Sequence, residues 1–364
     1  MKSTRRTFLR TALLMAGMII ILGSCAAQWE IDNPYGNVNW ETHEQYKANF
    51  HTHTTRSDGR LNPHTVVDRY HALGYSILAI ADHNEVTYPW TAFSQLQPSN
   101  RAIRLVENQD EGMPENLVYE DRDPAALNMF AIQANELSRH HHMGSFFNGY
   151  NGPGYNERID YTITEEESIL AVGEHNGIVM LYHPGRYERN SEWYVELYTR
   201  HDHLFGLEVY NQGDRYPEDR LIWDSILTVT MPHRPVWGYS NDDMHGPAQI
   251  GRNWNMMILP EMSEQAVRRG MEEGQSYFVY APQGHEGPAA PYIQAVDVDR
   301  RKGTISITAR DYERIIWISG GEILHEGNTI NLGQLDASLS YVRAELHGQA
   351  GSLAGTQPFG FRKP

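Results

Sequence analysis

The segment Ala48–Gly59 constrains the fold more than any other part of the chain. It reads Ala-Asn-Phe-His-Thr-His-Thr-Thr-Arg-Ser-Asp-Gly and places His51 and His53 two residues apart in an extended stretch. Side chains at positions i and i+2 of a strand point to the same face, so both imidazoles can bind one ion. Asp58 follows in a Ser-Asp-Gly turn, where its carboxylate can approach the strand end. The alternative is a surface strand with two solvated histidines.

Apolar runs alternate with helical patterns along residues 46–280. Ser76–His83 is a continuous apolar run that ends in polar residues, as in a strand buried on both faces of a parallel sheet. A capping box of Thr164 and Glu167 opens one of the intervening helices. Similar strand runs lie at 128–137, 178–183, 204–210, 235–240 and 256–259. Strands separated by helices predict an α/β domain with a parallel sheet, open or closed into a barrel.

The last part of the chain has a different pattern. From about Pro291 onward, short strand-like runs are broken by Gly and Asp turns, and no helix signal interrupts them. We therefore predict an α/β domain over residues 45–285 and a small antiparallel β-sandwich-like domain over residues 290–364. A linker rich in Asn, Trp and Tyr, residues 25–44, precedes the α/β domain.

The first 24 residues have the pattern of an export signal. The twin arginines Arg5 and Arg6, a short apolar run and small residues before a cleavage point are typical of a Tat-type signal peptide, residues 1–24. The sequence Leu-Gly-Ser-Cys ending at Cys25 is similar to a lipobox, whose cysteine is lipidated after cleavage. A transmembrane anchor is the alternative, but the apolar run is shorter than the ~20 residues of a membrane span. We expect an exported, membrane-anchored lipoprotein in the periplasm or at the cell surface.

Cysteine content and charge limit the partners. Cys25 is the only cysteine, so the chain has no disulfide partner and its fold needs a hydrophobic core. The formal charge is −16, and it becomes −20 when the signal is removed with Lys2, Arg5, Arg6 and Arg10. Nucleic-acid backbones are bound by clustered Lys and Arg, so this acidic chain argues against a nucleic-acid partner.

Imidazoles and carboxylates recur at the ends of the predicted strands. Asp82 and His83 end the second strand, Glu136 ends the third, and His183 ends the fourth in a Tyr-His-Pro-Gly sequence. In α/β barrels the C-terminal strand ends form one face, where the chemistry lies. We therefore expect these side chains to meet in space.

Two positions require a choice between neighbours. In the run of three histidines after the third strand, we select His141, with His142 as the second choice. In the Asp-Asp pair after the last strand, Asp243 is preferred to Asp242. The Asp-x-His step from Asp243 to His245 puts both side chains on one side of an extended segment.

The donor set predicts a metal centre that hydrolyses its substrate. The imidazoles and carboxylates exceed the four ligands of one tetrahedral ion, so two or three divalent ions are expected. Glu136 is the expected bridging ligand, because it lies in the middle of the set. Nitrogen and oxygen ligands without a thiolate favour Zn, Mn or Fe. Paired ions lower the pKa of bound water toward ~7 and hold the oxygens of an ester in line.

Four further polar residues each have two interpretations. Asp82 either orients a histidine from behind or caps its strand end. Arg186 either binds a substrate phosphate through two hydrogen bonds or lies solvated in its loop. Glu208 and Asn211 end another strand, where they either line the pocket or lie outside it. Asp82 and Arg186 are thus the candidate catalytic side chains besides the metal ligands.

The order and spacing of these residues resemble the motifs of the PHP (polymerase and histidinol phosphatase) family. The matching elements are His51-x-His53 with Asp58 in Ser-Asp-Gly, Asp82-His83, Glu136-Leu-Ser, Tyr-His183-Pro and Asp243-x-His245. The resemblance covers about residues 46–280. It implies a distorted (β/α)7 TIM-like barrel with a trinuclear metal site, usually that of a phosphoesterase. The lipoprotein signal and the C-terminal β domain are similar to those of exported members.

The resemblance also implies which residues share an ion. The first ion would be held by His51, His53, Glu136 and Asp243, the second by Glu136, His141 and His183, and the third by Asp58, His83 and His245. Many members have a histidine at the position of Asp58, so the third site differs between members.

Three functions are compatible with these observations. The leading hypothesis is a phosphoesterase, a phosphatase or phosphodiesterase that uses metal-activated hydroxide on a small exported or extracellular phosphoester. The second is an amidohydrolase that cleaves an amide, lactone or carbamate at the same ions. The third is a lipoprotein that binds a metal or ligand without catalysis.

Overall fold

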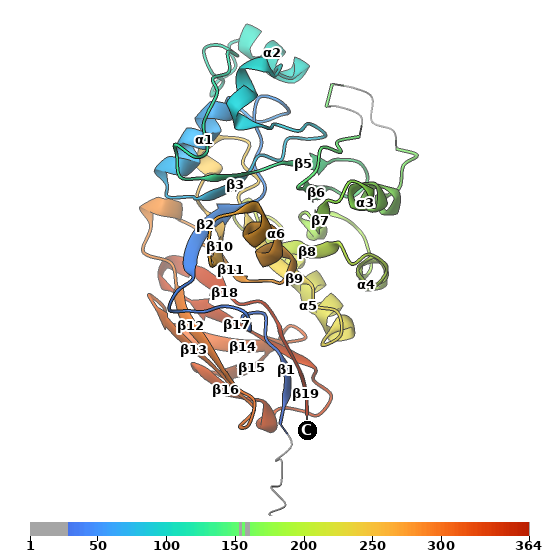
Figure 1. Cartoon of the computed structure of the whole chain (residues 1–364), viewed down its shortest axis with the longest axis vertical. Coiled ribbons are helices and arrows are strands. Elements are labelled where there is room, and N and C mark those ends of the chain that lie inside the picture. Colours follow the sequence, from blue (N-terminus) through green and yellow to red (C-terminus); the bar gives the residue numbers. More distant parts are fainter. Residues whose placement is uncertain (1–27, 153–154, 157–160, 364) are drawn as a thin grey trace, which may run out of the picture.

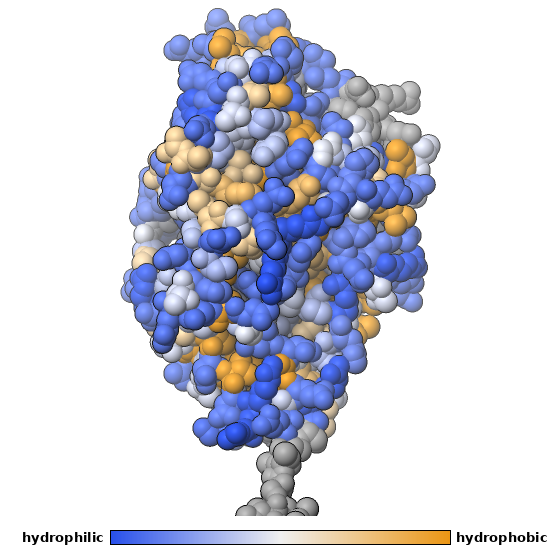
Figure 2. Space-filling model, in the orientation of Figure 1, coloured by the Kyte–Doolittle hydropathy of each residue, from blue (hydrophilic) through white to orange (hydrophobic). Residues whose placement is uncertain are grey.

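The computed structural model describes residues 28–152, 155–156 and 161–363, and the strands within them form three hydrogen-bonded sheets (Figure 1). The predicted signal peptide, residues 1–24, and the predicted lipid-anchor residue Cys25 lie outside the described residues. Among the described residues, no helix has the length and apolar character needed to span a membrane. The face shown in Figure 2 is mainly hydrophilic, with smaller hydrophobic areas.

Strands alternate with helices as far as β11, and strands dominate after it. The α-helices are α1 Pro63–Ala72, α2 Asn100–Glu107, α3 Glu165–Glu174, α4 Ser191–Arg200, α5 Glu218–Thr230 and α6 Glu264–Glu272. The strands of the α/β part are β2 Glu44–Asn49, β3 Ile77–Ala79, β4 Phe130–Ile132, β5 Ala134–Leu137, β6 Met143–Phe146, β7 Ile178–Leu181, β8 Leu204–Asn211, β9 Trp237–Asn241, β10 Asn253–Leu259 and β11 Ser276–Tyr280. The remaining strands are β1 Glu30–Asp32, β12 Tyr292–Asp299, β13 Thr304–Arg310, β14 Arg314–Ser319, β15 Glu322–Glu326, β16 Thr329–Asn331, β17 Tyr341–His347, β18 Leu353–Gly355 and β19 Phe359–Arg362.

The strands of the α/β part run in mixed directions. In the larger sheet, β2, β3 and β4 are parallel, whereas β10 is antiparallel to both β2 and β11. In the second sheet, β6 is antiparallel to β5 and β7, while β7, β8 and β9 are parallel. The expected α/β class is confirmed, the expectation of a purely parallel sheet is wrong, and the closed (β/α)7 barrel stays a prediction. An apolar run predicts a buried strand, but it does not give the direction of pairing.

Side-chain amides connect the two ladders along β9. Asn255 accepts a hydrogen bond from the backbone N–H of Ser240 at 3.0 Å and donates one to its carbonyl at 2.9 Å. Gln357 forms the same pair of bonds with Gly238, both at 2.8 Å. These amides satisfy buried backbone groups of β9 in place of a neighbouring strand. The hydrophobic cluster around Phe50 draws side chains from both ladders, so they enclose one interior.

The C-terminal strands continue the larger sheet. β18 pairs with both β11 and β17, and β19 joins β17 to β1. The segment predicted as a linker, residues 25–44, therefore contains a strand, β1. Its Tyr35 also donates a hydrogen bond to the carbonyl of Ser276 at 3.1 Å. In Figure 1 the C-terminal strands occupy one end of the molecule and α2 the other.

A buried ion pair joins the C-terminal strands to α5. The guanidinium of Arg343 on β17 donates to both carboxylate oxygens of Asp224, at 2.9 and 2.6 Å. It also donates to Glu345 at 2.6 Å. Burial raises the pKa of Glu345, but the opposing effect of Arg343 and His347 is larger. The pKa of Glu345 is therefore lowered overall, to about 2. The carboxylate of Glu345 therefore stabilises the folded state at neutral pH.

We predict a pH-dependent effect of Glu345→Gln. The folded pKa lies below the usual 4.5, so the stabilisation is complete above pH 4.5 and lost as the pH falls toward 2. The variant should lower the free energy of unfolding at pH 7 by about 2 kcal/mol, and less as the pH falls through this window. Urea unfolding of both proteins measures the difference. Glu326→Gln, an exposed change on β15, is the control. A difference that stays constant from pH 7 to pH 3 would contradict the assignment.

Candidate metal centre

The polar strand ends of the two ladders meet in one place. β2 leads into His51 and His53, β5 contains Glu136, β7 leads into His183, and β9 leads into Asp243. All five side chains are buried. Parallel bridges between 52 and 244 and between 83 and 136 hold the contributing segments side by side. The partly buried residues of the set are Asp58, His83, His142 and His245.

Glu136 lies at the centre of this set. Its carboxylate has no exposed surface, and imidazole nitrogens face both of its oxygens. Oε1 is 2.8 Å from His142 and 3.4 Å from His183, while Oε2 is 2.7 Å from His83, 3.4 Å from His53 and 3.5 Å from His51. A carboxylate in this position can bridge two ions.

Asp243 and Asp58 complete two neighbouring groups. Asp243 Oδ1 lies 3.1 Å from His53 Nε2 and 3.2 Å from His51 Nε2, and these two nitrogens are 3.1 Å apart. Asp58 Oδ1 lies 3.3 Å from His245 Nε2 and 3.8 Å from His53 Nδ1. Each group places nitrogen and oxygen lone pairs around a common point.

The donor atoms fit divalent cations. Buried atoms that form no hydrogen bond among the described residues include Glu136 Oε2, Asp58 Oδ1, His53 Nδ1 and His183 Nδ1. A buried polar atom without a partner costs about 1–3 kcal/mol, so the gathering of these atoms fits residues that would hold cations. The ligand groups are His53 with Asp58, His83 and His245; His51 with His53 and Glu136; His51 with His183 and Asp243; and His83 with Glu136 and His142. Imidazole and carboxylate donors without thiolate suit Zn, Mn or Fe.

The carboxylates of the centre are ionised. Burial raises the pKa of Glu136, but His83, His142 and His51 together hold it well below its usual value. Burial also raises the pKa of Asp243, but His51 and His53 lower it by more, so the overall shift is downward. The negative charge needed to bind cations is therefore present at neutral pH.

The carboxylates raise the pKa of two nearby imidazoles. Burial lowers the pKa of His83, but Glu136 and Asp58 raise it overall to about 10. Burial also lowers the pKa of His245, and Asp58 and Asp243 raise it overall to about 8. Cations and protons compete for these nitrogens, so binding of a divalent ion releases protons.

Glu208 supports the centre from behind. Its Oε1 is 2.9 Å from His51 Nδ1, and its Oε2 accepts a hydrogen bond from the backbone N–H of His183 at 2.8 Å. Asn241 and Asn211 each donate to it at 2.9 Å. With Nδ1 of His51 donating to this carboxylate, Nε2 is left as the ligand atom. The sequence left open whether Glu208 lines the pocket or lies outside it, because a strand-end carboxylate does not reveal its partner.

The structure places His142, not His141, beside Glu136. Consecutive residues entering a strand point to opposite sides, and β6 begins at Met143. The ring of His141 therefore turns away, stacks on Tyr187 at 4.1 Å and lies 3.2 Å from the Tyr194 hydroxyl. Burial lowers the pKa of His141 to about 3. The choice of His141 is corrected to His142.

Asp82 has a structural role. Its carboxylate accepts hydrogen bonds from the Thr54 N–H at 2.7 Å and from the hydroxyls of Thr54, Ser57 and Thr87 at 2.6 Å. These bonds hold the loop between His53 and Asp58 and occupy the oxygens of Asp82. These contacts favour the interpretation of Asp82 as a strand-end cap over a catalytic role.

Asp242 and Arg186 lie outside the ligand groups. Asp242 accepts hydrogen bonds from Tyr70 at 3.0 Å and from the N–H groups of residues 251–253, so only its neighbour Asp243 faces the centre. Arg186 ends the short 3-10 helix Pro184–Arg186 directly after His183. Its side chain is exposed, with the guanidinium 5.8 Å from the ring of Tyr187.

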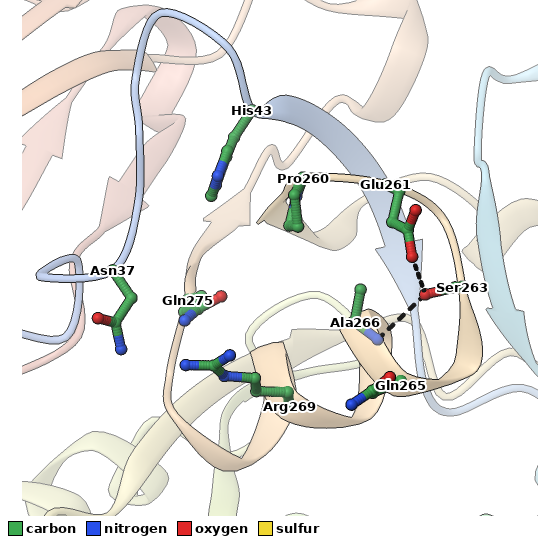
Figure 3. A pocket seen from close by; sticks show the side chains of 9 residues that line it. All are labelled: Asn37, His43, Pro260, Glu261, Ser263, Gln265, Ala266, Arg269 and Gln275. Atoms are coloured by element: carbon green, nitrogen blue, oxygen red, sulfur yellow. Dashed lines mark hydrogen bonds between the residues drawn. The ribbon is translucent and has the colours of Figure 1, made fainter.

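A cavity of about 450 Å³ lies elsewhere, beside residue 43, which precedes β2. Figure 3 shows its lining side chains, among them His43, Arg269 and Gln275. None of the candidate metal ligands lines it. The cavity is therefore separate from the metal centre, whose ligands follow the other end of β2.

Comparisons with known proteins give distant similarities. No protein-family model matches the chain. The 5′-3′ exoribonuclease Rnm of Salmonella typhimurium is 23% identical over 285 residues, which cover 59% of this chain and 94% of the relative.

Solved structures show similar chains at low scores. A two-domain protein containing a predicted PHP-like metal-dependent phosphoesterase from Bacteroides vulgatus has 18% identity and a TM-score of 0.48, over 90% of this chain and 88% of that chain. An amidohydrolase from Chromobacterium violaceum has 13% identity and a TM-score of 0.36, over 56% of this chain and 88% of that chain. Both TM-scores are below 0.5, so neither structure decides the fold or function of this chain.

We predict that Glu208→Gln weakens metal binding. The amide keeps the size of the side chain but removes the charge that orients His51, so affinity for Zn²⁺ or Mn²⁺ should fall about 10- to 100-fold. Calorimetric titration of chelator-stripped protein measures the change. Asp224→Asn removes a buried charge at α5 and serves as the control, which should lose stability but keep its metal affinity. Unchanged affinity in Glu208→Gln would contradict the role given to this carboxylate.

Proposed function

We propose that the chain is a metal-dependent hydrolase of the PHP type that cleaves phosphoesters. The position of Glu136 carries the proposal, because its carboxylate is shared by two of the ligand groups and has no exposed surface. A shared carboxylate holds two cations close enough to act on one ester. Zn, Mn or Fe are the proposed ions, two or three in number.

Each part of the centre has a separate task. When bound, the ions supply Lewis-acid activation of the phosphoryl group and a nucleophile derived from water. His51 and His183 are oriented by Glu208, and His142 takes the place first given to His141. Arg186, three residues after His183, is an exposed cation beside the centre that can pair with an anionic substrate.

The proposed substrate is a small phosphoester outside the cytoplasm. RNA is included among the phosphoesters to be tested, because the Salmonella relative is an exoribonuclease. The acidic composition that argued against nucleic acid describes the whole chain, whereas a substrate meets only the residues around the opening. An amide or lactone substrate needs no cation such as Arg186, so we place it second.

We predict that chelation abolishes hydrolysis of an aryl phosphate and that Zn²⁺ or Mn²⁺ restores it. Glu136→Ala should lower kcat/KM by about 10³-fold or more, because it removes the ligand shared by two ions. Glu326→Gln, the exposed change on β15, is again the control. Turnover of amides or lactones but not phosphoesters would assign the centre to the second function, and bound metal without turnover to the third. Full phosphatase activity after both treatments would refute the proposal.

We also propose that the chain is exported and anchored to a membrane through a lipid on Cys25. The twin arginines and the Leu-Gly-Ser-Cys sequence support this location. Cys25→Ala should move the protein from the membrane fraction to the soluble fraction and abolish labelling by radioactive palmitate. Membrane association that survives the substitution would contradict the anchor.

A further inference from the structure

The strand ends of β7, β8 and β9 share an unusual backbone conformation. His183, Gln212 and Asp243 follow or end these neighbouring strands, and their φ angles are +31°, +47° and +43°. Non-glycine residues seldom adopt this left-handed region, and such residues gather at functional sites. His183 and Asp243 belong to the metal centre, whereas Gln212 has no ligand role there.

Gln212 instead connects the centre to an arginine. Its amide donates to the carbonyl of Asp243 at 3.0 Å, and its Oε1 accepts a hydrogen bond from Arg215 at 2.8 Å. The guanidinium of Arg215 lies 5.2 Å from the ring of Tyr216. Arg215 is thereby fixed relative to a candidate metal ligand by one intervening side chain.

Two tyrosine–arginine pairs lie near His183. Tyr216 lies 5.9 Å from the ring of His183, and Tyr187 lies at the same distance from it. Arg186 extends from the second pair, as Arg215 does from the first. The loops after β7 and β8 thus place two exposed cations near one ligand.

Both cations lack a carboxylate partner among the described residues. Nearby arginines do have one, since Arg189 pairs with Glu165 at 2.6 Å and Arg220 pairs with Asp214 at 2.7 Å. In a chain of formal charge −16, two exposed arginines without such a partner near one candidate ligand are available to an anion.

We propose, resting on the proposed phosphoesterase function, that Arg186 and Arg215 form a second phosphate subsite beside His183. The reacting phosphoryl group lies at the metal centre, and the subsite binds a second phosphate of the same substrate. That phosphate belongs either to a small bisphosphate or to the next position of a nucleic-acid strand. Arg186 and Arg215 are specificity-determining residues in both cases.

The test compares esters that differ in one charge. Phenyl phosphate is compared with its 2-, 3- and 4-phosphonomethyl derivatives, which add a stable second anion at three distances. At least one derivative should have a higher kcat/KM than phenyl phosphate. The ratio of these two kcat/KM values should fall about tenfold in Arg186→Gln/Arg215→Gln, equivalent to 1.4 kcal/mol. Arg186→Lys/Arg215→Lys keeps both charges and should restore part of the ratio. Arg189→Gln, which removes an arginine already paired with Glu165, should keep the wild-type ratio.

Binding gives a readout that does not depend on turnover. The phosphonomethyl phenols carry only the second anion, and calorimetry should show about tenfold weaker binding of the best of them to the double Gln variant. If the wild type does not hydrolyse phenyl phosphate, the phosphoesterase function is contradicted. Binding of the phosphonomethyl phenols still tests the subsite in that case. An unchanged ratio and unchanged phenol binding in the double variant would overturn the subsite. An equal loss in Arg189→Gln would also overturn it.

RNA distinguishes the two sources of the phosphate. One short RNA is compared with and without a 5′-phosphate under the same conditions. A preference for the phosphorylated strand that depends on Arg186 and Arg215 supports the subsite and assigns it to a strand. A preference confined to the aryl derivatives supports the subsite and assigns it to a small molecule.

Discussion

Burial of the Glu136 carboxylate among imidazoles is the constraint on which the site depends. A carboxylate without exposed surface is costly unless positive charge and hydrogen-bond donors surround it. Here the compensation comes from histidines supplied by β2, β7 and the loops beside β3 and β6. Those segments must all end close to a single carboxylate. This requirement explains why residues with a left-handed backbone, such as His183 and Asp243, occur there.

Support for these histidines extends into the fold through buried amides. Asn241 donates to Glu208 and accepts a hydrogen bond from Asn255, the residue that also binds the backbone of β9. A chain of side chains therefore runs from the junction of the two ladders to His51. Buried networks of this kind are stable only when every member is satisfied, so fold and site are coupled.

Chemically distinctive residues made most of the site predictable from sequence. Histidines and carboxylates at strand ends identify themselves by type and spacing, as His51, His53 and Glu136 do. Pairing direction leaves no such mark, because nothing in the residues of β6 or β10 indicates that their neighbours run antiparallel. The amides at positions 255 and 357, which replace strand partners, carry no recognisable pattern at all. For the same reason a run of three adjacent histidines could not reveal that residue 142, at the edge of β6, faces inward.

The pairing of β1 with β19 decides how a pull on the N-terminal segment would be transmitted. β1 meets the rest of the described chain as a three-residue antiparallel ladder, with Glu30 opposite Arg362. In the sheet, β19, β17, β18, β11 and β10 lie between β1 and β2, while residues 33–43 join these two strands directly along the chain. A pull on the N-terminal segment would therefore separate the short β1–β19 ladder first and would then load residues 33–43, which lead into β2 and the histidines.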